Sequence, residues 1–213
     1  MFSLRKLILI IMGWETNIRN ITDEPVVCCI SHTSKWEILL YFLYRYNEKL
    51  RNIKIVMKPQ PFKSYGWILK KFGFIPSTRR EDTRNGFVEN TIEMLKDEKI
   101  KHIVISPEGT LSATPWRSGY FYIAKGINYP IGVAGFDFEK KKLIVSKEKF
   151  IHENIITTEP RIKSAMGKIV PLYEEKSFVT IRKHKKENVG LISKNIYYYG
   201  IPILILITKY CLD

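Results

Sequence analysis

Cysteine is scarce in this sequence of 213 residues, and so are acidic side chains relative to basic ones. The three cysteines (Cys28, Cys29 and Cys211) are too few for a disulfide framework, and Cys28 and Cys29, as direct neighbours, do not pair easily. The sequence also lacks a Cys-x-x-Cys pair or a spaced set of His and Cys, so nothing suggests a structural zinc site. These absences favour a reducing compartment.

Apolar runs long enough to cross a bilayer are missing as well. A membrane-spanning helix needs about 20 apolar residues, and the stretches 7–12 and 196–208 are both shorter. Stretch 7–12 follows Arg5 and Lys6, but no small-residue cleavage pattern of a signal peptide comes after it. Stretch 196–208, broken by Gly200 and Pro202, has two open interpretations. It is either a buried strand or helix, or a segment in the membrane interface with tyrosine and lysine anchors.

Positive charge is what the sequence has in excess: 35 Lys and Arg against 21 Asp and Glu, a net charge of +14. Such a surface attracts nucleic acid, anionic lipid or phosphorylated metabolites, and composition does not choose among them. The basic run 182–186 is either a solvated face or a contact for lipid headgroups or phosphates. A hydrophobic fraction of 45% supplies a packed core, which excludes disorder for most of the chain and predicts one domain.

From residue 26 onward, short apolar runs alternate with amphipathic segments. This pattern predicts strands at 26–30, 53–57, 102–105, 131–134 and 143–145, and helices at 34–46, 67–72, 84–97 and 118–126. Gly73 and Gly126 are expected to end two of the helices. Alternation of this kind predicts an α/β fold, with a mixed, mainly parallel sheet flanked by helices. Reactive residues should then gather at the carboxyl ends of the strands.

His32 stands directly after the first predicted strand and before a helix, and Glu37 lies five positions on. A carboxylate in the first helical turn can hold one imidazole nitrogen as N–H and leave the other free to take a proton from a hydroxyl. The spacing Ser34-x-x-Glu37 also fits a capping box, in which Glu37 binds the backbone N–H of Ser34 and has no catalytic role. Both interpretations stay open on the local pattern.

Two further groups of polar residues follow predicted strands or short apolar segments. Segment 106–110 places a carboxylate at Glu108 in a turn where Gly109 lets backbone approach a ligand, and Arg117 comes close behind. Segment 73–80 ends in Arg79 and Arg80, whose guanidinium groups suit a phosphate, or alternatively a salt bridge to the acidic residues that follow.

Taken in order, these blocks resemble the glycerolipid acyltransferase family, which includes lysophosphatidic acid and glycerol-3-phosphate acyltransferases. That family has His followed five residues on by Asp, then Gly-x-Ile-x-x-x-Arg, then Pro-Glu-Gly-Thr, then an apolar block with a central Pro. This sequence is similar at His32 and Glu37, at 73–79, at 107–110 and at 129–133. The resemblance covers roughly residues 25–145.

The resemblance implies that His32, oriented by Glu37, acts as general base on a hydroxyl of a lysophospholipid or glycerol phosphate. This hydroxyl attacks the thioester of acyl-CoA or acyl carrier protein, and no bound cofactor or metal is needed. The residues implied in acceptor binding are Arg79, Pro107, Glu108, Gly109 and Thr110. Leu111 stands where many members have Arg, and Arg80 and Arg117 are candidates to replace that charge.

Three segments are expected: an apolar membrane-associating segment at 1–25, the acyltransferase core that the resemblance implies at 26–150, and an extension at 151–213 that is basic and then apolar. An anionic membrane surface, a lipid acceptor and a thioester donor are the expected partners, without nucleic acid. The protein is expected at a membrane, peripheral or monotopic, with its site on the cytosolic side. Because Glu37 and Leu111 depart from the family pattern, the alternative is a catalytically weak or inactive lipid-binding protein.

Overall fold

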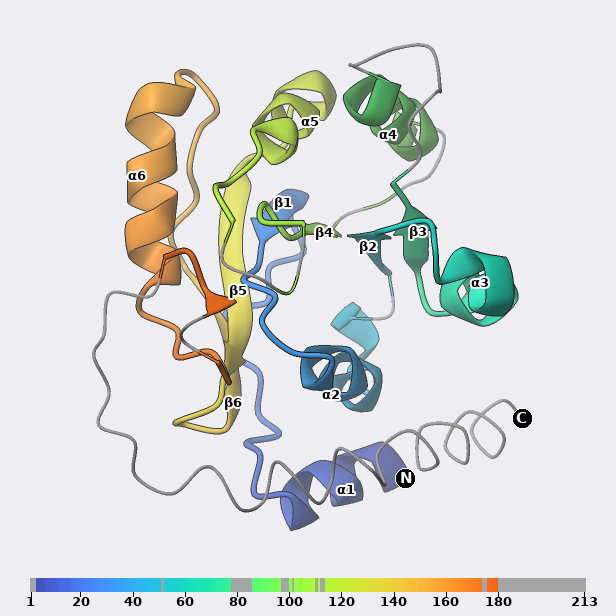
Figure 1. The fold of residues 1–213 in the computed structure, drawn as a ribbon. Helices are drawn as coiled ribbons and strands as arrows, with labels where there is room; N and C mark the ends of the chain where they lie inside the picture. Colours follow the sequence, from blue (N-terminus) through green and yellow to red (C-terminus); the bar gives the residue numbers. More distant parts are fainter. Residues whose placement is uncertain are drawn as a thin grey trace. The chain divides into compact units, whose positions relative to one another are not determined.

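The computed structural model describes residues 3–50, 52–77, 86–96, 100, 102–109, 111, 114–173 and 176–179 (Figure 1). The chain divides into a compact unit at Met1–Thr180 and a second unit at Ile181–Asp213, which contains no described residue. The predictions for 182–186 and 196–208 therefore lie outside the described residues, as do Arg79, Arg80 and Thr110.

One six-stranded sheet organises the first unit, in the order β3-β2-β4-β1-β5-β6. Its strands are β1 (Val26–Cys29), β2 (Ile53–Met57), β3 (Phe74–Pro76), β4 (His102–Ile105), β5 (Ile131–Asp137) and β6 (Lys142–Val145). Neighbouring strands from β3 to β5 pair in parallel, and β6 runs antiparallel to β5. This confirms the predicted mixed, mainly parallel sheet. All four residues of β1 are buried, as expected of a central strand covered on both faces.

Helices cover both faces of this sheet (Figure 1). They are α1 (Leu4–Ile11), α2 (Trp36–Tyr44), α3 (Phe62–Lys71), α4 (Gly86–Lys96), α5 (Gly119–Ile127) and α6 (Ile155–Met166), with a short 3-10 helix at Glu48–Leu50. Apolar residues of α4, α5 and α6 form one core cluster with Val27, Ile103 and Ile131 of the sheet. A second cluster joins α1 and α2 to the sheet. No helix within the described residues is long and apolar enough to cross a membrane.

The N-terminal segment packs onto the sheet alongside α2. Leu9 of α1 is completely buried, and the ring of Trp14 meets Phe138 edge to face with 5.2 Å between ring centroids. The hydroxyl of Tyr44 donates to the carbonyl of Glu15 across 2.6 Å. The segment is therefore part of the second core cluster, and it leaves one stripe of α1 exposed.

Three elements were not predicted as helix or strand, namely α1, β3 and α6. Strand β3 has only three residues and is stabilised by pairing with β2, a long-range effect that local pattern does not report. Helix α6 contains Pro160 and buries only Thr158, Ile162 and Met166, so its apolar periodicity is weak. Tertiary packing against β5 stabilises it despite the proline.

The predicted end of α5 at Gly126 is wrong by one residue, because Asn128 adopts the left-handed conformation (φ 57°) that ends the helix. Gly126 has a different role. A Cβ at this position would lie 2.3 Å from Cδ1 of Ile92, so the glycine allows α4 and α5 to approach closely.

Gly73 does end α3 as predicted, and its replacement should be costly. Its φ is +81°, and a Cβ would lie 2.4 Å from the carbonyl oxygen of Ile53. We expect Gly73→Ala to lower the free energy of unfolding by about 3 kcal/mol, from backbone strain and steric overlap together. Urea denaturation measures this, with Gly66→Ala as control, since a Cβ at Gly66 meets only Phe62, at 3.6 Å. Equal stability of Gly73→Ala and the unmodified chain would contradict the expectation.

Candidate functional site

The loops after β1 and β4 lie side by side at the carboxyl edge of the sheet. These two strands pair in parallel, with Cys29 opposite Ile105, and the N–H of Ile30 donates to the carbonyl of Ile105 across 3.0 Å. The register therefore brings the His32 loop next to the turn that begins at Ser106. This is the edge at which sites of open α/β sheets form.

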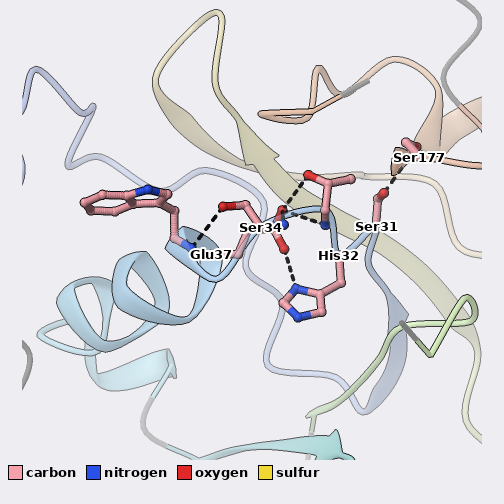
Figure 2. A network of polar contacts seen from close by, with 7 residues as sticks. Ser31, His32, Ser34, Glu37 and Ser177 are labelled. Atoms are coloured by element: carbon pink, nitrogen blue, oxygen red, sulfur yellow. Dashed lines mark hydrogen bonds and ion pairs between the residues drawn. The ribbon is translucent and has the colours of Figure 1, made fainter. Parts of the chain in front are cut away.

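His32 and Glu37 form a close pair at this edge. Nδ1 of His32 lies 2.5 Å from Oε2 of Glu37, and the side chains are 24% and 8% exposed. Figure 2 shows the imidazole with one nitrogen on Glu37 and the other turned away from the network. A carboxylate at Nδ1 favours the tautomer with its proton on Nδ1, which leaves Nε2 as an acceptor.

The second oxygen of Glu37 binds the loop itself. Oε1 accepts from the backbone N–H and the hydroxyl of Thr33, both across 3.0 Å, and from the N–H of Ser34 across 3.2 Å. The last bond is the one that a capping box predicts. The hydroxyl of Ser34 accepts from the N–H of Trp36, the first residue of α2. One carboxylate thus caps the start of α2 through Oε1 and holds the imidazole through Oε2.

Glu108 lies in the neighbouring turn and is completely buried. Its Oε1 accepts from the backbone N–H of Phe178 across 3.1 Å. Burial raises the pKa of this carboxyl to about 7, although the N–H of Phe178 and the indole of Trp116 lower it. Glu37 raises the same pKa and His32 lowers it, so the charge state of Glu108 is coupled to the pair.

The sequence profile of one family, described as Acyltransferase, matches residues 15–133, more than half of the chain. The chain belongs to the acyltransferase family. The match begins before β1 and ends within β5, so it contains both loops of the site. No curated protein matches the chain.

Other residues implied in acceptor binding by the resemblance are only partly described in this acyltransferase. Pro107 is buried, and Gly109 takes a left-handed conformation (φ 65°) that suits glycine. The side chain of Arg117 is exposed, while its N–H donates to the carbonyl of Pro107 across 3.0 Å. The backbone of Arg117 is therefore held next to the Pro107 turn, and its side chain is exposed to solvent.

Sequence reasoning missed the contribution of residues 176–179 to the acyltransferase site. The hydroxyl of Ser31 donates to that of Ser177 across 3.2 Å, and the N–H of Phe178 binds Glu108 (Figure 2 shows the serine pair). This segment therefore contacts the loop after β1 and the loop after β4. No local signal could have revealed it, because the two pairs are 146 and 70 residues apart in the chain.

The raised pKa of Glu108 predicts a stability that depends on pH. The folded protein holds a proton there up to about pH 7, against an ordinary pKa of 4.5, so the stability contributed by this carboxyl is present below about pH 4.5 and is lost as pH rises through 7. Between about pH 5 and about pH 8, we expect the acyltransferase to lose about 2 kcal/mol of unfolding free energy relative to Glu108→Gln. Urea denaturation at both pH values measures this difference.

The matched control for that measurement is Glu153→Gln, which alters an exposed carboxylate. Its free energy of unfolding should equal that of the wild-type protein at both pH values. If the difference in free energy of unfolding between Glu108→Gln and the wild type were the same at both pH values, the pKa of Glu108 would not be raised in the folded acyltransferase.

Proposed function

We propose that this acyltransferase is of the glycerolipid type and moves a fatty acyl group from acyl-CoA or acyl carrier protein to a hydroxyl of a lysophospholipid or glycerol phosphate. The observation that carries the proposal is the short contact between His32 Nδ1 and Glu37 Oε2 in a chain of the acyltransferase family. It leaves Nε2 of a partly exposed imidazole available as a general base.

The proposed reaction needs no covalent acyl-enzyme. Nε2 of His32 takes the proton of the acceptor hydroxyl while its oxygen attacks the thioester carbonyl carbon. The imidazolium that forms is stabilised by Glu37, which lies against Nδ1. When the tetrahedral intermediate collapses, the C–S bond breaks and the thiolate takes the proton from Nε2. The products are the ester and the free thiol, and the histidine returns to its neutral form.

The acceptor's phosphate is proposed to bind cationic residues of the chain. Strand β3 leads the chain to Arg79, the main proposed anchor, and Arg80 and Arg117 are the proposed replacements for the arginine absent at Leu111. Pro107, Gly109 and Thr110 belong to the proposed acceptor pocket. Glu108, being buried, is proposed to act by holding residues 176–179 against this turn.

Membrane association is part of the proposal, since acceptor lipids reside in bilayers. On α1, the side chains of Leu4, Leu7, Ile10 and Ile11 are exposed, and Arg5 and Lys6 lie on the same helix. An apolar stripe accompanied by basic residues suits the surface of an anionic membrane. The cytosolic position of the site remains part of this proposal.

The second candidate is a catalytically weak or inactive lipid-binding protein with the same fold. It is favoured by glutamate at 37 and leucine at 111, where the resembling family has Asp and commonly Arg. The two candidates agree on lipid binding and differ in turnover.

Thiol release separates them. Purified full-length protein is incubated with acyl-CoA, alone and with a panel of lysophospholipids and glycerol 3-phosphate, and free thiol is followed with time. We expect release that depends on one class of acceptor, with formation of the acylated product. Binding of the lysophospholipids without any acceptor-dependent release would favour the second candidate.

A further inference from the structure

We propose that the outer face of α3 is a docking surface for an anionic lipid bilayer, separate from the exposed stripe of α1. The α3 face comprises Lys63, Trp67, Lys70 and Lys71. Tyr65 is also exposed, but it is two positions from Trp67 and has non-helical backbone angles (φ −125°, ψ 20°), so it is not counted in this face. This inference deepens the proposed function, on which it rests for the expectation that the acceptor is a lipid. Its basis is the combination of an exposed tryptophan with unopposed positive charge.

The tryptophan of the α3 face is open to solvent. Trp67 is 65% exposed. Tryptophan has an apolar ring and a polar N–H, and it concentrates at the level of lipid headgroups. Because the core does not use this indole, it is available to enter the headgroup region of a bilayer.

The charge of the α3 face has a single sign. Lys63, Lys70 and Lys71 are exposed, and among the described residues none of them forms an ion pair. Between Glu48 and Glu81 the sequence contains no acidic residue at all. Trp67 lies three and four positions before Lys70 and Lys71, so the ring and the two ammonium groups share one side of the helix. This pairing of a tryptophan with lysines complements anionic headgroups better than it complements a neutral protein groove.

The opposite side of α3 is already used by the fold. Leu69 is buried and Ile68 is partly buried, and the helix packs against β3. Figure 1 shows α3 at the β3 end of the sheet, with no other described element outside it. The outer face is therefore available to a flat partner without any rearrangement of the core.

Helix α3 links the two edges of the sheet. It begins at the carboxyl edge, where His32 and Glu108 lie, and runs back to the amino edge, because β3 is parallel to β2 and starts beside the beginning of β2. Phe74 pairs with Ile55, and a Cβ at Gly73 would lie 2.4 Å from the carbonyl oxygen of Ile53. Lys63 is therefore nearer the carboxyl edge and Lys70 and Lys71 are nearer the amino edge, so a bilayer on the α3 face would lie along this side of the sheet.

Vesicle binding by the full-length protein tests the proposal. Co-sedimentation is measured with phosphatidylcholine vesicles, with and without phosphatidylglycerol, and with no acyl donor or lysophospholipid present. On the anionic vesicles we expect Trp67→Ala to weaken binding about tenfold. The double variant Lys70→Gln, Lys71→Gln should weaken it about 25-fold at low salt, with the difference shrinking as salt is raised.

Matched controls come from α5, on the other side of the sheet. Tyr122 is 49% exposed and Lys125 is exposed. Tyr122→Ala and Lys125→Gln should each bind vesicles as the wild type does. All altered side chains are exposed, and thermal unfolding verifies that the variants fold.

A second readout is the depth of Trp67 in the bilayer. Brominated lipids should quench the fluorescence of Trp67. The quenched fraction of the total tryptophan fluorescence should therefore be smaller in Trp67→Ala than in the wild type. Unchanged vesicle binding by both α3 variants, or no binding by the wild type, would overturn the proposal. Loss of self-association in Trp67→Ala by light scattering, with vesicle binding intact, would assign this face to a second copy of the chain and also overturn it.

The outcome is independent of catalysis. Activity on glycerol 3-phosphate, a soluble acceptor, requires no bilayer and should be equal in the α3 variants and the wild type. Weakened vesicle binding in an inactive protein would support the docking surface and count against the proposed function. If the protein is active and its α3 variants bind vesicles as the wild type does, the result would support the proposed function and count against the docking surface.

Discussion

Replacing His32 with alanine should reduce kcat for acceptor-dependent thiol release by about 10³-fold, the contribution typical of a positioned general base. Without an imidazole, the acceptor hydroxyl must lose its proton to water during attack. The KM values for donor and acceptor should change little, because His32 is proposed to act on the reacting proton and not on binding. Steady-state kinetics with saturating acyl-CoA measure both quantities.

The control for this variant is His152→Ala, which removes a histidine in the loop before α6. Its kcat should equal that of the wild type. If His32→Ala turned over at the wild-type rate, His32 would not be the base, and another group would have to accept the proton.

Replacing Glu37 with glutamine should separate its two contacts. The glutamine oxygen can still accept from the N–H groups of Thr33 and Ser34, so the start of α2 should remain capped. Its NH₂ group would instead donate to Nδ1 of His32, which moves the imidazole proton to Nε2 and leaves no acceptor for the hydroxyl. We expect kcat to fall by about 10²- to 10⁴-fold while the free energy of unfolding changes little.

Glu37→Ala provides the comparison, since it removes both contacts and leaves buried donors at Thr33 and Ser34 without an acceptor. It should lose the same activity and also about 1–3 kcal/mol of stability. Glu93→Gln, which alters an exposed carboxylate of α4, serves as the neutral control. Wild-type turnover by Glu37→Gln would mean that Glu37 only caps the helix.

Much of the sheet could be predicted because its strands are short apolar runs. The bounds predicted for β2 and β4 are those of the structure. The helices α2, α4 and α5 were predicted with ends in error by one or two residues, since helix ends depend on local conformations such as that of Asn128. Strand β3 and helix α6 could not be predicted, because their stability comes from β2 and β5 and not from their own composition.

For the site, local spacing named the partners without choosing between their roles. His32 and Glu37 are five residues apart across the start of a helix, so the sequence offered their contact as one of two interpretations, and the structure shows it together with the helix cap. The burial of Glu108 did not follow, because its carboxylate is covered by residues 176–179, far along the chain. A turn of the form Pro-Glu-Gly by itself suggests an exposed carboxylate.

The sequence alone determined the α/β class, the order of most of its elements and the resemblance to acyltransferases, because each depends on local periodicity or on residues close in the chain. Only the tertiary structure decided that Glu37 both caps α2 and holds His32, that Glu108 is buried with a pKa near 7, and that α3 presents its aromatic rings to solvent. These features depend on which segments, distant in the sequence, bury a given side chain or leave it exposed. Such burial is a result of tertiary packing, and it leaves no local pattern in the sequence.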